Sequence, residues 1–194
     1  QIAPVYRDAQ RWLADGSFLV LRKYRQFVHR LEAAVDAPAV TMLEILGDKG
    51  AGSTAGKDDK LTLEVCREIV YGKLMGRLRN GASMVEPDET EPTSQNLFDY
   101  ADDKSGKRCP LSAHVRRAHP RTPPAGAGRV PRLMRRGMTY GPDRAPGKVD
   151  DGADRGLIFM AYNADLSEQF EVVQRWLTGG NPTGTSSASF CPIV

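Results

Sequence analysis

Residues 155–177 read RGLIFMAYNADLSEQFEVVQRWL and carry the most regular pattern in the chain. The first part, GLIFMAY at 156–162, is apolar enough to predict a central strand of a sheet. In the second part, apolar residues recur at helical spacing over 166–177, which predicts an amphipathic helix. Asp165 is placed to cap that helix, and Glu168 stands in the capping-box position. A buried strand followed directly by a helix indicates a fold that mixes the two.

The rest of the chain adds two strands and two helices. The stretch GSFLVLRKY at 16–24 predicts a buried strand, and residues 132–138 predict another. Apolar residues at helical spacing predict a short helix that starts at Phe27 and ends near Pro38, and a longer helix over 61–78. This order of elements predicts an α+β fold in which helices pack on an antiparallel sheet.

Two stretches without periodicity are predicted to be long loops, 47–60 and 79–130. The first, GDKGAGSTAGKDDK, resembles a phosphate-binding loop but breaks its pattern. Ala51 stands where that motif needs glycine, and Lys57 is followed by Asp58 instead of a serine or threonine. A surface loop is therefore the better interpretation than a nucleotide site.

Length and composition exclude several classes of protein. The 194 residues are 40% hydrophobic and 26% charged, which is typical of one globular domain. No apolar run approaches the ~20 residues needed to span a bilayer. Three cysteines, Cys66, Cys109 and Cys191, are too few and too scattered for a disulfide framework, and Cys66 is expected in the core. The start at Gln1 is interpreted as a cut end, and the compartment, cytoplasmic or exported, stays open.

Positive charge is concentrated in one segment. Residues 104–142 contain ten lysines and arginines and no acidic residue, whereas the remainder holds 17 basic against 24 acidic residues. Concentrated cationic charge usually meets an anion, such as a nucleic acid, a phosphate or the carboxylates of a cofactor.

Three chemistries could use this segment. Nucleic-acid binding fits the arginines, but no aromatic residue between Asp102 and Thr139 offers a stacking platform. Zinc could be bound by Cys109, His114 and His119, although their spacing matches no common zinc motif. Haem could be bound by a histidine, with arginines that pair with its propionates. The residue pattern alone leaves these alternatives open.

Four stretches, in order along the chain, resemble the dye-decolourising peroxidase family. They are GSFLVLRKYRQ (16–26), NLFDYADDKSGKRCPLSAHVRRAHPR (96–121), RRGMTYG (135–141) and the stretch 155–177 quoted above. The resemblance implies a haem b peroxidase built of two ferredoxin-like units, with residues 1–194 forming most of the C-terminal, haem-binding unit. It also implies hydrogen peroxide and bulky aromatic or dye-like reductants as substrates.

Site residues follow from the same resemblance. His114 in AHVRR corresponds to the proximal iron ligand, and Arg135 in RRGM to the distal arginine. Arg117 and Arg116 are the nearest candidates to pair with the haem propionates, with Arg117 preferred. An acidic partner for His114 could come from Asp165, Glu168 or Glu171, although helix capping also explains Asp165 and Glu168.

Two departures from the family pattern affect the expected activity. The family usually has asparagine where this chain has His119. No GxxDG motif, whose aspartate handles the peroxide proton, occurs in the 194 residues. General acid–base help typically contributes ~100- to 10,000-fold, so impaired turnover is expected of this chain alone. A non-catalytic haem-binding remnant and a basic nucleic-acid-binding domain are the alternatives, a homo-oligomer is possible, and no nucleic-acid or membrane partner is expected.

Overall fold

A computed structural model describes residues 13–50, 61–86, 96–121, 130–144, 150–179 and 191–193. The chain, predicted to form one domain, divides into two compact units. Unit 1 consists of residues 1–27 and 131–174, and unit 2 of residues 28–130 and 175–194. Parts of both predicted loops, 51–60, 87–95 and 122–129, lie outside the described residues.

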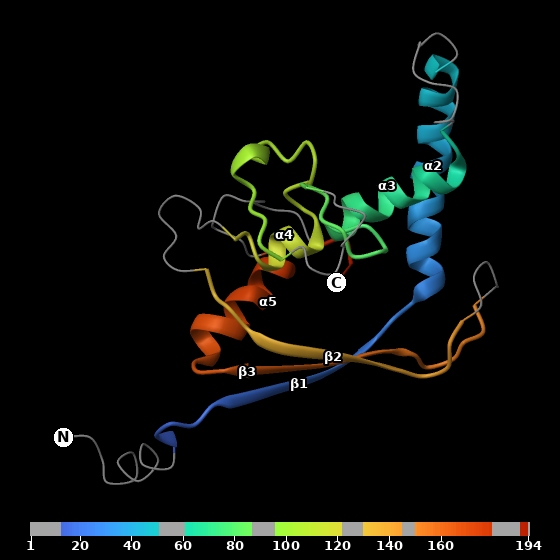
Figure 1. The fold of residues 1–194 in the computed structure, drawn as a ribbon. Helices are drawn as coiled ribbons and strands as arrows, with labels where there is room; N and C mark the ends of the chain where they lie inside the picture. The colour runs from blue at the N-terminus through green and yellow to red at the C-terminus, as the bar shows by residue number, and fades with distance from the viewer. Residues whose placement is uncertain are drawn as a thin grey trace. The chain divides into compact units, whose positions relative to one another are not determined.

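Unit 1 is built on a three-stranded antiparallel sheet with β3 in the centre (Figure 1). Its strands are β1 (Phe18–Arg25), β2 (Met134–Tyr140) and β3 (Gly156–Asn163). Both outer strands run antiparallel to β3. The predicted α+β class, the antiparallel sheet and the central strand are confirmed, and β2 begins two residues later than predicted.

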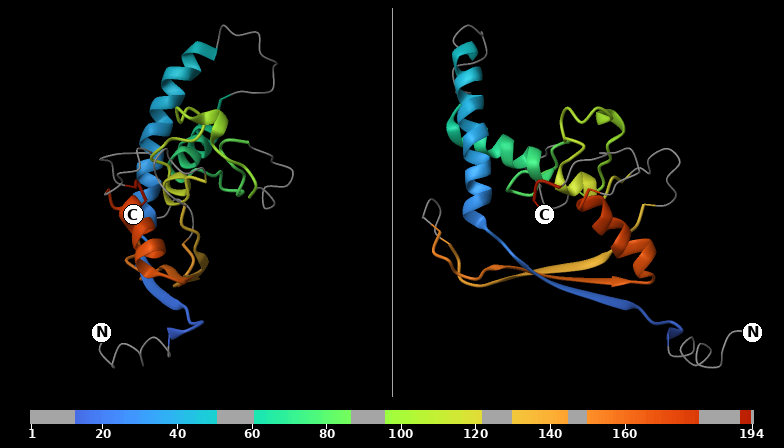
Figure 2. Two further views of the ribbon diagram at one scale, coloured as in Figure 1. Left: turned by 90° about the vertical axis from the view of Figure 1, so that its left-hand side faces the viewer. Right: turned by 180° about the vertical axis from the view of Figure 1, so that it is seen from behind.

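The helix that follows β3 begins on one face of this sheet, at the end of β3 (Figure 2). It starts as a π-helical turn, η3 (Leu166–Phe170), and continues as α5 (Glu171–Leu177). The ring of Phe170 packs against Phe159 of β3, with 6.3 Å between the ring centroids. Burial of this apolar contact holds the helix on the strand that precedes it, as the alternation of sequence patterns predicts.

The start of η3 confirms the predicted cap in part. The Asp165 carboxylate accepts hydrogen bonds from the backbone N–H groups of Ser167 and Glu168. The reciprocal bond that was expected of Glu168 is made by its neighbour Gln169, whose side-chain oxygen accepts from the backbone N–H of Asp165. The pKa of Asp165 lies below its usual range because Ser167 and the helix N–H groups favour the ionised carboxylate.

The opposite face of the sheet exposes apolar side chains. Seven of the eight residues of β1 are exposed, so the prediction of a buried strand is wrong. Leu21 and Met134 are 60% and 71% exposed. The reason is that β1 lies at the sheet edge and no described element of unit 1 packs on this face. The apolar sequence therefore indicated a strand correctly but not its burial.

Of the two glycines in the sheet, Gly137 and Gly156, the second has less room for a side chain. A Cβ atom at this position would collide with the backbone carbonyl oxygen of Tyr24 in β1. Gly156→Ala is therefore expected to destabilise the chain by about 1–3 kcal/mol, because a backbone strand must move. Urea denaturation measures the change.

Gly47→Ala is the control. This site is helical, and a Cβ atom there would lie 3.8 Å from the side chain of Leu43, so the free energy of unfolding is expected to rise by about 0.5–1 kcal/mol. Equal changes in the two variants would contradict the tight approach at Gly156.

Two helices form the apolar core at the start of unit 2. They are α2 (Val28–Gly50) and α3 (Leu63–Met75). Val35 and Ala39 of α2 are buried against Cys66 and Val70 of α3. The predicted helix over 61–78 and the core position of Cys66 are confirmed.

Helix α2 continues through Pro38, so the prediction that it ends there is wrong. A proline inside a helix costs about 3 kcal/mol because it removes one hydrogen bond and clashes with the preceding turn. The apolar stripe resumes after Pro38 with Ala39, Met42 and Leu43, which pack in the same core. Residues 47–50, predicted as the start of a loop, are the last residues of α2. Among the described residues, no helix combines the length and the apolar character needed to cross a membrane.

Candidate functional site

The candidate site residues of unit 2 lie on a short helix, α4 (His114–Ala118). The predicted loop 79–130 contains this helix and one 3₁₀ turn, η2 (Ala101–Asp103). Helix α3 ends close to α4 because Gly76 takes a left-handed conformation, with φ of 88°. A Cβ atom on Gly76 would lie only 3.3 Å from Val115 and 3.4 Å from Cys109. A glycine is therefore needed where the two helices meet.

His114 is the first residue of α4, and its side chain has a sulfur partner. The Nδ1 atom lies 3.1 Å from Sγ of Cys191. Cys191 is a free thiol and only 3% exposed. Because Nδ1 faces this thiol, Nε2 is the ring nitrogen through which His114 would bind a metal.

Arg116 belongs to a buried network with Asp103. Its guanidinium donates to the Asp103 carboxylate at 2.9 Å, to the Asp103 carbonyl at 2.8 Å and to the Cys109 carbonyl at 2.6 Å. Its charge also lies 4.3 Å from the centre of the Tyr100 ring. Both members of the ion pair are buried. The donors of Arg116 are thus occupied within the protein.

The environment of this ion pair shifts three pKa values. Burial by itself raises the pKa of Asp103. Hydrogen bonds from the backbone N–H groups of Arg108 and Cys109, together with the charge of Arg116, outweigh this effect, so the pKa of Asp103 lies below its usual range. Burial raises the pKa of the Cys109 thiol to about 11 and also raises the pKa of Tyr100. At neutral pH, Asp103 is ionised, whereas Cys109 and Tyr100 are protonated.

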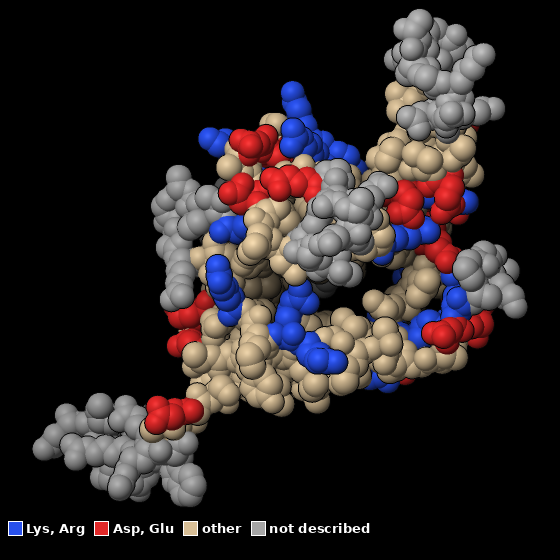
Figure 3. All heavy atoms as spheres, in the orientation of Figure 1, with Lys and Arg blue, Asp and Glu red and all other residues tan. Residues whose placement is uncertain are grey.

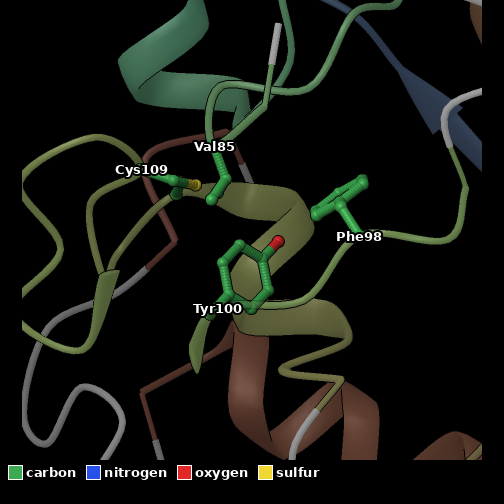
Figure 4. Close-up of a cluster of buried hydrophobic side chains, with 5 residues drawn as sticks. Val85, Phe98, Tyr100 and Cys109 are labelled. Atoms are coloured by element: carbon green, nitrogen blue, oxygen red, sulfur yellow. The ribbon is translucent and has the colours of Figure 1, made fainter. Parts of the chain in front are cut away.

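The network is completed by an apolar cluster. The side chains of Val85, Phe98, Tyr100 and Cys109 belong to one buried cluster, in which Val85 and Tyr100 lie between Cys109 and Phe98 (Figure 4). The Phe98 and Tyr100 rings meet edge to face, with 5.7 Å between centroids. This packing is a structural role for Cys109. Among the described residues, no three histidine, cysteine or acidic side chains are grouped so that they could hold a metal ion.

Arg117 is 1% exposed, and its side chain has a different partner from that of Arg116. Its Nε donates to the backbone carbonyl of Trp176 in α5. Placement of a guanidinium in so buried a position requires anionic or carbonyl partners, since a buried cation without them is costly. Arg117 therefore suits a cofactor carboxylate better than Arg116, whose donors Asp103 already binds.

Arg135 lies in unit 1, on β2. It pairs in register with Ala161, on the sheet face to which Phe159 and Phe170 belong. Its side chain is exposed and makes no hydrogen bond or ion pair with other described residues. An exposed guanidinium of this kind is free to bind an anion. The structure thus brings His114, Arg116 and Arg117 together on one helix and places Arg135 in the other unit.

Comparison with known proteins identifies the family. The sequence model described as "Dyp-type peroxidase, C-terminal" matches residues 2–188. The chain belongs to the Dyp-type peroxidase family. The resemblance that was inferred from the four sequence stretches is confirmed.

Related proteins support the same assignment. The chain is 27% identical to a dye-decolorizing peroxidase of Mycetinis scorodonius over 90% of this chain and 34% of the relative. It is 31% identical to a multifunctional dye peroxidase of an Amycolatopsis strain, over 86% of this chain and 34% of the relative. An ancestral D-type dye-decolorizing peroxidase structure aligns with a TM-score of 0.67 and 26% identity, over 92% of this chain and 39% of that one. The chain thus spans about a third of the length of these curated relatives.

Unit 2 contains the types of side chain that a haem of a Dyp-type peroxidase requires. A single axial nitrogen ligand is sufficient for such a haem, and a buried cation near it can pair with a propionate. His114 offers Nε2 while Nδ1 faces a thiol, and Arg117 supplies a buried guanidinium three residues later. The donor set therefore fits a haem, in contrast to a zinc ion, which needs several clustered ligands.

Two residues important to this arrangement were missed by sequence reasoning. Cys191 was read only as one of three scattered cysteines, and Asp103 received no role. An acidic partner of His114 was sought at Asp165, Glu168 or Glu171, but Asp165 caps η3, and the side chain that faces Nδ1 of His114 is the thiol of Cys191. No local pattern links His114 to a residue 77 positions away.

Proposed function

We propose that this chain binds haem b through Nε2 of His114, as part of a peroxidase that uses hydrogen peroxide to oxidise bulky aromatic or dye-like reductants. The observation that carries the proposal is the His114–Cys191 contact on α4, because it assigns Nδ1 to the thiol and so makes Nε2 the ligand nitrogen. The family membership supplies the reaction class. When bound, haem supplies the redox chemistry of the peroxide reaction.

The residues of the chain have separate roles in this proposal. His114 would hold the haem iron through Nε2, and Arg117 would pair with a haem propionate. Arg135 would supply a permanent positive charge that stabilises the negative charge developing on peroxide as its O–O bond breaks. Arg116, proposed from sequence as a second propionate partner, is the weaker candidate because its guanidinium already binds Asp103.

A nucleic-acid-binding role has less support. Arg116 and Arg117 are both buried, so two arginines of the basic segment are withdrawn from any phosphate backbone. On the face drawn in Figure 3, lysine and arginine side chains lie among aspartate and glutamate side chains. The described residues on that face therefore form no continuous basic surface of the kind that nucleic-acid binding uses.

Replacement of the proposed ligand tests the function. After haem reconstitution, the wild-type chain is expected to show the visible absorption spectrum of a histidine-ligated haem, and His114→Ala is expected to lose it. The physical reason is that no second imidazole is held in the same position. A haem titration followed by absorbance measures the affinity of each variant.

His119→Ala is the matched control, since it removes an imidazole five residues away and is expected to retain the wild-type spectrum. Loss of the spectrum in His119→Ala with retention in His114→Ala would assign the ligand to His119. A folded wild-type chain that takes up no haem would contradict the proposal.

Turnover of the isolated chain is proposed to be impaired. No GxxDG motif occurs in its 194 residues, and an aspartate that moves the peroxide proton typically contributes ~100- to 10,000-fold. Bound haem without any peroxide reaction would favour the alternative of a non-catalytic haem-binding protein.

A further inference from the structure

The C-terminal end of α5 binds both Cys191 and α4, the helix that carries His114. The last carbonyl groups of a helix have no partner within the helix and accept hydrogen bonds from elsewhere. At the end of α5, the Trp176 carbonyl accepts from Nε of Arg117, which belongs to α4. The next carbonyl, that of Leu177, accepts from the backbone N–H of Cys191 at 2.9 Å. Two consecutive carbonyls of α5 thus bind the two segments that carry His114 and Cys191.

The local chain also restricts Cys191. Pro192 follows it, and a residue before proline is confined to extended conformations. The backbone bond to Leu177, the neighbouring proline and the burial of the side chain leave the thiol little freedom. The 3.1 Å approach of Sγ to Nδ1 is therefore set by the fold of unit 2 and does not depend on an exposed, mobile side chain.

The direction of the hydrogen bond decides which nitrogen can bind iron. If the thiol donates to Nδ1, the proton of the neutral ring is on Nε2, which then has no lone pair for a metal. If Nδ1–H donates to sulfur, Nε2 is unprotonated and can act as the ligand. Partners of a ligating histidine usually fix its tautomer and ring orientation in this way.

We propose that Cys191 is the positioning residue of the haem ligand: its sulfur accepts the Nδ1–H of His114 and so keeps Nε2 unprotonated, the state in which it can bind iron. This inference rests on the proposed function. A thiol is a weak acceptor compared with a carboxylate. His114 is therefore a weaker electron donor than it would be with an aspartate partner, which lowers the stabilisation of oxidised iron.

Haem affinity and the iron–histidine bond test this role. Cys191→Ala is expected to weaken haem binding about 10- to 100-fold, as is typical when the partner of a ligating histidine is removed. The iron–histidine stretching band in resonance Raman spectra of the ferrous protein is expected to move to lower frequency in Cys191→Ala. In Cys191→Asp it is expected to move to higher frequency, because a carboxylate increases the basicity of the ring.

A control and a haem-free measurement complete the test. Cys66→Ala makes the same chemical change at a buried cysteine of the α2–α3 core and is expected to leave both haem readouts unchanged. In the haem-free chain, ¹⁵N chemical shifts of the His114 ring report its tautomer, and Nδ1–H is expected in the wild type but not as a fixed state in Cys191→Ala.

The outcomes separate the two proposals. If neither Cys191 variant changes the haem affinity or the Raman band, the positioning role is overturned, whereas the assignment of His114 as the ligand is unaffected. An Nε2–H tautomer in the haem-free wild type would also overturn it. A folded wild-type chain without haem uptake would overturn the proposed function and the role of Cys191 together.

Discussion

Replacing Asp103 by alanine is expected to lower the free energy of unfolding by about 3–5 kcal/mol, because it leaves the Arg116 charge buried without its partner. Arg116 donates to both the carboxylate and the backbone carbonyl of Asp103, and both residues are buried. The carboxylate also accepts the backbone N–H groups of Arg108 and Cys109, at 3.0 and 2.9 Å. Its removal therefore leaves several buried donors unsatisfied. Urea denaturation measures the loss.

Asp102→Ala is the matched control for this variant. Asp102 precedes Asp103 in the same 3₁₀ turn but is exposed, so a change within about 0.5 kcal/mol is expected. A comparably small effect of Asp103→Ala would contradict the structural role of the network.

The stability contributed by Asp103 is also expected to depend on pH. Its pKa in the folded chain is below the usual value, so its ionised form stabilises the fold at pH values above about 4, the pKa expected when unfolded. This contribution is lost as the pH falls through the lower pKa of the folded state. The difference in stability between wild type and Asp103→Asn should accordingly shrink in acid.

Arg135→Leu is expected to slow the reaction of the haem-loaded chain with hydrogen peroxide about 100- to 1,000-fold, the usual effect of removing one group that stabilises developing negative charge. The side chain is exposed on β2 and makes no hydrogen bond or ion pair with described residues, so its loss should leave stability almost unchanged. Stopped-flow absorbance measures the rate at several peroxide concentrations.

Arg136→Leu provides the control, because Arg136 is the next residue of β2 and its side chain belongs to the opposite face of the sheet. It removes the same charge and is expected to retain the wild-type rate. Equal slowing in both variants would indicate a general effect of net charge and would contradict the distal role of Arg135.

Elements with a strong local pattern were predicted correctly. The apolar run of β3, the helical spacing after it and the Asp165 cap are all confirmed. Each depends on residues within a few positions, because hydrogen bonds and side-chain periodicity in strands and helices act over that range. The family was also recognised from the order of four short stretches, and the match over residues 2–188 confirms it.

Long-range packing decided the features that were predicted wrongly or not at all. Helix α2 passes Pro38 because its apolar stripe meets α3, and β1 is exposed because it lies at a sheet edge. Neither fact is present in the local sequence. The burial of an element depends on which other elements pack against it.

The same distinction holds for the candidate site. The sequence was sufficient to nominate His114, Arg117 and Arg135 through the family resemblance. The neighbours of these residues depend on contacts between distant parts of the chain. Asp103 meets Arg116 across 13 residues and Cys191 meets His114 across 77. For the second pair, the carbonyls at the end of α5 bind both α4 and Cys191 and so bring the two segments together.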